Sequence, residues 1–147
     1  MAHSVELARQ LLLLAGTAKR TCIIVRWYSP SIGMLKLNTD ESMLRGSTHA
    51  LEGGLLRGDQ GRWRGGFVAN IGTCYILFTE VWCIWQGLIY AGGMGVRKIQ
   101  VESDYLAAVE MIHGSFTMNA LCRPMVLSIQ ELWSCGPGLT LVRSDTY

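Results

Sequence analysis

The stretch that decides how this chain is interpreted is KLNTD at residues 36–40, which ends in Asp40. Leucines alternate with polar residues over residues 34–40, and a period of two is typical of a half-buried β-strand. A second extended run, IQVESD at residues 99–104, ends in Asp104. We therefore expect two strands that each carry a carboxylate at the carboxyl end.

A third acidic residue, Glu80, lies within residues 76–92, which are predicted to form a helix. Glu80 shares the apolar side of this helix with Leu77 and Ile84, because residues three and four apart lie on one face. A buried carboxylate is unfavourable unless it is paired. Glu80 therefore either belongs to a site or lies at the wet edge of the first turn, where the helix dipole favours it.

Each strand-end aspartate also has a structural interpretation, as a turn residue or a helix N-cap. This alternative is strong for Asp104, because a helix is predicted directly after it. If the strands that end in Asp40 and Asp104 are parallel neighbours, however, their carboxylates lie side by side. That edge is where ligands bind in open α/β sheets.

The order of the predicted elements indicates a mixed α/β domain. The GDQG turn at residues 58–61 joins two strands as a hairpin. A helix between the third and fourth strands implies a crossover, which leaves a parallel pair in the sheet. The predicted strands are 34–40, 51–58, 62–70, 97–103 and 139–142, and the predicted helices are 76–92, 104–113 and 120–134.

Composition favours one intracellular globular domain. Half of the 147 residues are hydrophobic and 16% are charged, which argues against disorder. The formal net charge of +2 is too small to imply a polyanionic partner by itself. The five cysteines form no C-x-x-C pair, so reduced thiols are expected rather than zinc or disulfides.

The N-terminal part is expected to lie outside the domain. Residues 3–16 are predicted to form an amphipathic helix and residues 19–33 a linker, so residues 1–33 precede a domain at 34–147. The apolar run at residues 11–14 is too short for a membrane span, which takes roughly 20 residues. We therefore expect no membrane partner.

Carboxylates that converge from two strands and a helix suit hard divalent cations. They would repel one another unless a cation intervened, and Mg²⁺ prefers carboxylate, water and phosphate oxygens. Two such ions can flank a phosphodiester, where one activates water and the other stabilises the leaving oxygen. The three acids therefore predict a metal site that acts on phosphodiesters.

Five stretches, in this order and spacing, resemble the ribonuclease H domain. The resemblance is to the plant version derived from non-LTR retroelement reverse transcriptases, and it covers roughly residues 26–147. It implies a ribonuclease-H-like mixed five-stranded sheet with flanking helices, and Mg²⁺-dependent endonuclease cleavage of the RNA strand in RNA–DNA hybrids. The stretches are KLNTD (36–40), GGLLR (53–57), QGRW (60–63), TEVW (79–82) and VESD (101–104), after a lead-in that contains Trp27, Pro30 and Gly33.

The same resemblance assigns roles to the three acids. Asp40 would bridge both Mg²⁺ ions, and Asp104 would complete the available ligand set. Glu80 would bind one ion and lie near the RNA 2′-hydroxyl, the group that distinguishes RNA from DNA.

The chain departs from the family pattern at several positions. Glu41 stands where glycine usually follows the first aspartate, and Leu51 and Glu52 stand where small residues are usual. The family's final helix, which brings a fourth aspartate, has no counterpart here, and Asp145 does not match that aspartate. Residues 34–147 are therefore expected to be a domain without its final helix.

Phosphate contacts would come from cationic side chains, which bind nucleic acid without reading its sequence. Each of them is equally well interpreted as a solvated surface charge. One alternative function is a catalytically impaired, retroelement-derived binding module, and another is a protein-interaction domain that uses the N-terminal helix. The candidate nucleic-acid-binding residues are Arg57, Arg62, Arg64, Arg97 and Lys98.

Overall fold

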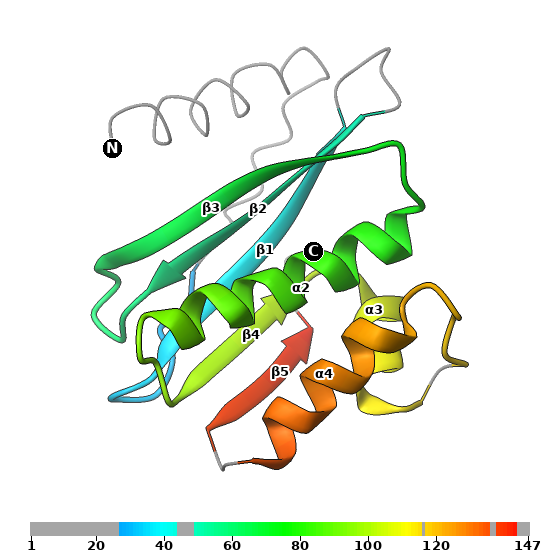
Figure 1. Ribbon diagram of the computed structural model, residues 1–147. Coiled ribbons are helices and arrows are strands. Elements are labelled where there is room, and N and C mark those ends of the chain that lie inside the picture. The colour runs from blue at the N-terminus through cyan, green and yellow to red at the C-terminus, as the bar shows by residue number, and fades with distance from the viewer. Residues whose placement is uncertain (1–26, 44–48, 116, 136–137, 144–147) are drawn as a thin grey trace.

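The computed structural model of the chain describes residues 27–43, 49–115, 117–135 and 138–143, with the backbone alone for residues 40–43, 50, 142 and 143. Within these described residues, five strands and three helices follow one another in the predicted order (Figure 1). They are β1 (Leu35–Met43), β2 (Ala50–Arg57), β3 (Trp63–Gly72), α2 (Ile76–Gly93), β4 (Ile99–Ser103), α3 (Leu106–His113), α4 (Arg123–Ser134) and β5 (Leu139–Arg143).

The strands form one mixed sheet in the order β3-β2-β1-β4-β5. The hairpins make β1–β2 and β2–β3 antiparallel. The crossover through α2 makes β1–β4 parallel, and β5 then adds parallel to β4. The predicted mixed five-stranded sheet and the predicted parallel pair are both confirmed.

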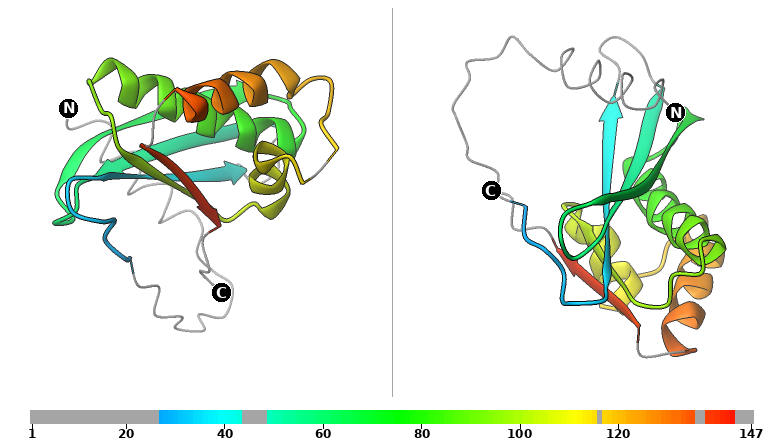
Figure 2. Two further views of the ribbon diagram at one scale, coloured as in Figure 1. Left: turned by 90° about the horizontal axis from the view of Figure 1, so that it is seen from below. Right: turned by 90° about the vertical axis from the view of Figure 1, so that its left-hand side faces the viewer.

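The three helices cover one face of the sheet (Figure 2). The core lies between them and the strands, where Leu37, Leu56 and Val101 are fully buried beneath Val81 and Ile84 of α2. The opposite face, which we call the open face, carries no helix within the described residues. Residues 27–34 run along this open face before β1 begins (Figure 2).

Local sequence explains where several elements end. Gly61 adopts a φ of 75° in the β2–β3 turn, a conformation that favours glycine. Helix α2 ends at Gly93, and Gly95 follows with a φ of 77°. Helix α4 begins at Arg123 rather than at residue 120, and Pro124 lies in its first turn, where its missing N–H removes no helical hydrogen bond.

One boundary prediction is wrong in a way that matters for the site. Asp40 does not end its strand, because β1 continues to Met43. The extra residues are held by pairing with β2, in which Glu41 lies opposite Glu52 and Met43 lies opposite Ala50. The predicted N-terminal helix at residues 3–16 falls outside the described residues. Within the described part, no helix is long and apolar enough to cross a membrane.

Candidate functional site

The register of β1 and β4 runs toward two of the predicted acids, Asp40 and Asp104. Leu35 pairs with Ile99 and Asn38 with Glu102, so each partner lies 64 positions further along the chain. Continued at this offset, the register sets Asp40 (40 + 64) level with Asp104. Asp104 directly follows β4 and is exposed.

The N-cap interpretation of Asp104 is wrong. The N-cap of α3 is Tyr105, and no side chain caps this helix. The Tyr105 N–H donates instead to Ser103 Oγ, over 3.2 Å. The Asp104 carboxylate takes no part in capping, and Asp104 is exposed at the end of β4.

Glu80 is buried in the second turn of α2, with 3% of its surface exposed. The wet-edge interpretation is therefore wrong. Its neighbour Thr79 is also buried, and Cys83, one turn further on, donates its thiol to the Gly53 carbonyl over 3.1 Å. These contacts hold this part of α2 against β2, so the position of Glu80 is fixed by packing.

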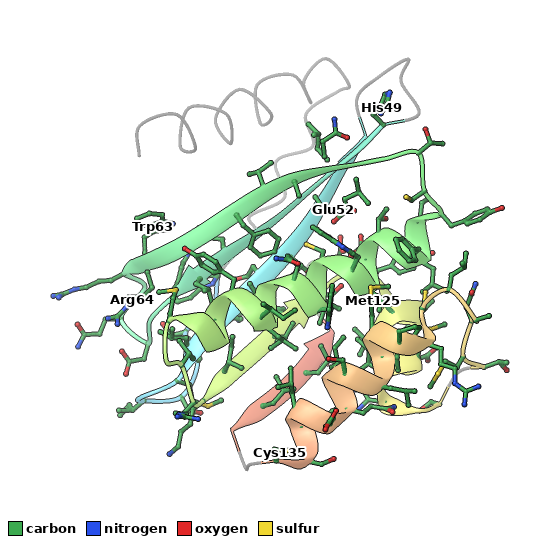
Figure 3. All side chains as sticks on the ribbon, in the orientation of Figure 1. His49, Glu52, Trp63, Arg64, Met125 and Cys135 are labelled. Carbon is green, nitrogen blue, oxygen red and sulfur yellow. The ribbon has the colours of Figure 1, made fainter. Side chains whose placement is uncertain are left out.

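Glu52 is not among the predicted site residues, yet only 1% of its surface is exposed. It lies in β2 on the side that faces α2 (Figure 3). The strand sequence Leu51–Leu56 places leucines on both faces, so alternation alone does not show which face is covered. The only signal in the sequence is a charged residue where the family pattern has a small one.

The open face carries a polar cluster that we call the Lys36 cluster. Lys36 is 2% exposed and forms an ion pair with Glu102. Its ammonium also donates to the Tyr28 carbonyl over 2.8 Å, and Asn38 Nδ2 donates to Glu102 over 3.3 Å. Trp27 covers the cluster and donates its indole N–H to Asn38 Oδ1 over 3.1 Å.

Among the predicted cationic residues, Arg57 has a distinct environment. Its guanidinium carbon lies 5.2 Å from the centroid of the Trp27 ring, so it stacks on the indole that covers the Lys36 cluster. Arg62, Arg64, Arg97 and Lys98 are exposed and form no ion pair with any described residue.

The exposed cations gather at one end of the sheet. Trp63, which is 54% exposed, and Arg64 begin β3 at the end remote from Glu52 (Figure 3). Arg97 and Lys98 precede β4, and the Lys98 carbonyl accepts from the Leu35 N–H at the start of β1 over 3.1 Å. Lys98 and Asp104 therefore lie at opposite ends of β4, about 20 Å apart at about 3.3 Å per residue.

Three oxygen-bearing acids are the donors that Mg²⁺ prefers, so Asp40, Glu80 and Asp104 fit such an ion in their chemistry. No group of three or more His, Cys, Asp or Glu side chains suited to a metal occurs among the described side chains, a set that does not include Asp40. Among the described thiols, those of Cys83 and Cys122 are buried. Burial raises the pKa of Cys122, which keeps this thiol protonated.

One hollow in the described surface lies between α3 and α4. This hollow of about 270 Å³ is lined by Ile112, His113, Gln130, Trp133 and Ser134. The His113 imidazole packs edge-on against Trp133 and hydrogen-bonds the Leu141 carbonyl over 3.2 Å. Its polar groups are therefore engaged within the fold.

The sheet order β3-β2-β1-β4-β5, with its helices on one face, is a ribonuclease-H-like fold. Solved structures support this. RNase H1 of Halobacterium salinarum aligns with a TM-score of 0.66 at 16% identity, over 76% of this chain and 85% of that one. An N-terminal RNase H domain from Mycobacterium tuberculosis aligns with a TM-score of 0.67 at 16% identity, over 76% of this chain and 87% of that one. LC11-RNase H1, solved with an RNA/DNA hybrid, aligns with a TM-score of 0.65 at 16% identity, over 75% of this chain and 84% of that one.

The chain belongs to the reverse transcriptase-like family, whose model matches residues 38–140. A curated relative is the "Putative ribonuclease H protein" of Arabidopsis thaliana, which is 36% identical over 92 residues. The match covers 63% of this chain but only 15% of that protein. The chain thus corresponds to a small part of this relative.

Proposed function

We propose that this domain binds nucleic acid and cleaves the RNA strand of RNA–DNA hybrids, with two Mg²⁺ ions held by Asp40, Glu80 and Asp104. The observation that carries the proposal is the β1–β4 register, which, continued two residues past its last pair, would set Asp40 level with Asp104. Glu80 lies on the helix that packs over β1 and β2. Three carboxylates thus come from three elements that the fold brings together.

When bound, Mg²⁺ activates water and stabilises the leaving oxygen of a phosphodiester. The protein's part is to place the ligands. Asp104 is exposed directly after β4, where a phosphate can approach. Glu80 is buried and held by the packing of α2, so it loses little further side-chain freedom on binding an ion.

The exposed cations supply the substrate contact in this proposal. Arg62, Arg64, Arg97 and Lys98 would contact phosphates at the opposite end of the sheet from Asp104. The separation of about 20 Å corresponds to about six base pairs of a duplex at 3.4 Å per pair. Arg57 would contribute less, because its guanidinium already stacks on Trp27.

The relatives favour the same function. The name of the Arabidopsis protein refers to ribonuclease H, and LC11-RNase H1 was solved with an RNA/DNA hybrid. The retroelement origin suggested by the sequence resemblance belongs to the same proposal.

A cleavage assay tests the proposal. The full chain is incubated with an end-labelled RNA–DNA hybrid in Mg²⁺, beside Asp40→Asn and beside a reaction with excess EDTA. We expect cleavage by the wild type alone. Cleavage that persists undiminished in Asp40→Asn would overturn the assignment of the metal site.

A binding module without catalysis is the second candidate. Two observations favour it: exposed cations with no ion pair among the described residues, and the pairing of Glu41 with Glu52 in the register directly after Asp40. Like charges directly opposite one another destabilise a strand pair. An inert chain that binds hybrid with a steep salt dependence would identify this function. A chain that binds no hybrid would favour the protein-interaction alternative.

A further inference from the structure

The helix-covered side of the sheet changes from apolar to polar toward the end of β1. Leu37 and its partner Leu56 are fully buried in the apolar core. One pair further along β1, Thr39 lies opposite Gly54, and Thr39 is 6% exposed. Its hydroxyl is buried and has no hydrogen-bond partner among the described residues. Glu52 then follows on the same side and is 1% exposed.

Two contacts fix how α2 runs over β2. Cys83 Sγ donates to the Gly53 carbonyl over 3.1 Å. A side chain at Gly87 would collide with Leu37, whose partner in β2 is Leu56. From residue 83 to residue 87 the helix therefore advances in the same direction as β2.

This alignment brings Glu80 level with Glu52 along the direction of β2. Glu80 lies three residues before Cys83, which is about 4.5 Å along the helix at 1.5 Å per residue. In a strand, about 4.5 Å corresponds to one or two residues at about 3.3 Å each. Along the strand direction, Glu80 therefore lies beside the position one or two residues before Gly53, which is Glu52 or Leu51. Of these two residues, only Glu52 is fully buried.

We propose that Glu52 is a further carboxylate ligand of the divalent cation that Glu80 binds, with the Thr39 hydroxyl as a neighbouring oxygen donor. This proposal rests on the proposed function, because it concerns the same cation. Two carboxylates buried at one level repel each other unless a cation or a proton lies between them. Carboxylate and hydroxyl oxygens are hard donors that suit Mg²⁺ or Mn²⁺. Glu52 is thus a ligand contributed by β2, beyond the three acids of the sequence prediction.

The test measures metal binding without catalysis. The thermal unfolding midpoint of the full chain is titrated with Mg²⁺ and with Mn²⁺, because an ion that binds the folded state raises this midpoint. The variants are Glu52→Gln, Glu80→Gln and the double variant. Glu131→Gln, an exposed carboxylate on α4, is the matched control.

In Glu52→Gln we expect the metal concentration needed for stabilisation to rise by at least about 10- to 100-fold, because the loss of a group that merely hydrogen-bonds a metal ligand already has an effect of this size. Glu131→Gln should titrate as the wild type does. The double variant should respond as Glu80→Gln does, because both residues bind one ion. If Glu52→Gln does not fold, Glu52→Asp replaces it and should show a smaller weakening, because its carboxylate is drawn back by one methylene.

Three results would overturn the proposal, and they are distinguishable. If Glu52→Gln keeps the wild-type metal response while Glu80→Gln loses it, Glu52 is no ligand and the proposed function stands. If Glu52→Gln lowers the unfolding midpoint by the same amount with and without metal, the role of the Glu52 side chain is structural. If the wild type responds to neither ion, this inference and the metal site of the proposed function both fail.

Discussion

Replacing Glu102 with glutamine removes one charge from the ion pair of the Lys36 cluster while it keeps an oxygen acceptor for Asn38. The two partners are unequal. The Lys36 side chain is 2% exposed, whereas that of Glu102 is 17% exposed. After the change, the buried ammonium keeps only the Tyr28 carbonyl, at 2.8 Å, as its described acceptor. Removing the counter-charge of a buried ion costs about 3–5 kcal/mol, because the remaining charge is held away from water.

The reciprocal change should cost less. Lys36→Met removes the buried charge itself and leaves Glu102 partly in water, with the Asn38 amide still donating to it. We expect a loss of about 1–3 kcal/mol. The double variant with methionine at position 36 and leucine at 102 should lie closer to wild type than Glu102→Gln does, since apolar replacement of a buried pair is often neutral.

Urea unfolding followed by circular dichroism and tryptophan fluorescence measures these losses. With an m-value of about 2 kcal/mol/M, Glu102→Gln should lower the midpoint by about 1.5 M or more. Equal losses in the two single variants, or a loss below about 1 kcal/mol for Glu102→Gln, would refute the reasoning from unequal burial.

Four further predictions concern Trp27, the cysteines and the exposed arginines. Trp27→Ala removes an indole hydrogen bond and a cation–π partner, so it should destabilise the domain by about 2–4 kcal/mol in urea unfolding, while Trp27→Phe should lose less. Alkylation at pH 8 should modify exposed Cys135 before buried Cys122, as peptide mass spectrometry would record. Because burial raises the pKa of Cys122 above its ordinary 9.0, its contribution to stability is present below pH 9 and is lost as pH rises through the folded-state pKa. Arg64→Ala and Arg97→Ala should each weaken hybrid binding for all sequences and reduce the salt slope by about 1, and an unchanged slope would remove that residue from the interface.

The alternation of apolar and polar residues, together with the turn signals, was sufficient to predict the order of strands and helices along the chain. Leu35 and Leu37 alternate with polar residues, and the glycines at 58 and 61 mark the hairpin, so the order of elements along the chain and the presence of a parallel pair follow from local chemistry. That the parallel partners are β1 and β4 was left open by the sequence. The burial of Glu80 was one of two stated alternatives, because it shares a stripe with Ile84.

Other features depend on tertiary context. The continuation of β1 past Asp40 arises from pairing with β2, which no local propensity encodes. Glu52 lies in a strand with leucines on both faces, so its burial depends on which face α2 covers. The stacking of Arg57 on Trp27 joins residues that lie 30 positions apart, and it requires residues 27–34 to lie on the open face.

The central claim is that the carboxylates on β1, α2 and β4 form one metal site that acts on RNA in a hybrid. The most direct measurement follows an RNA–DNA hybrid labelled on either strand, with the full chain in Mg²⁺, beside Glu80→Gln. We predict that the wild type cleaves the RNA strand, leaves the DNA strand intact, and loses this cleavage in Glu80→Gln. Equal cleavage by wild type and Glu80→Gln, or cleavage of both strands alike, would contradict it.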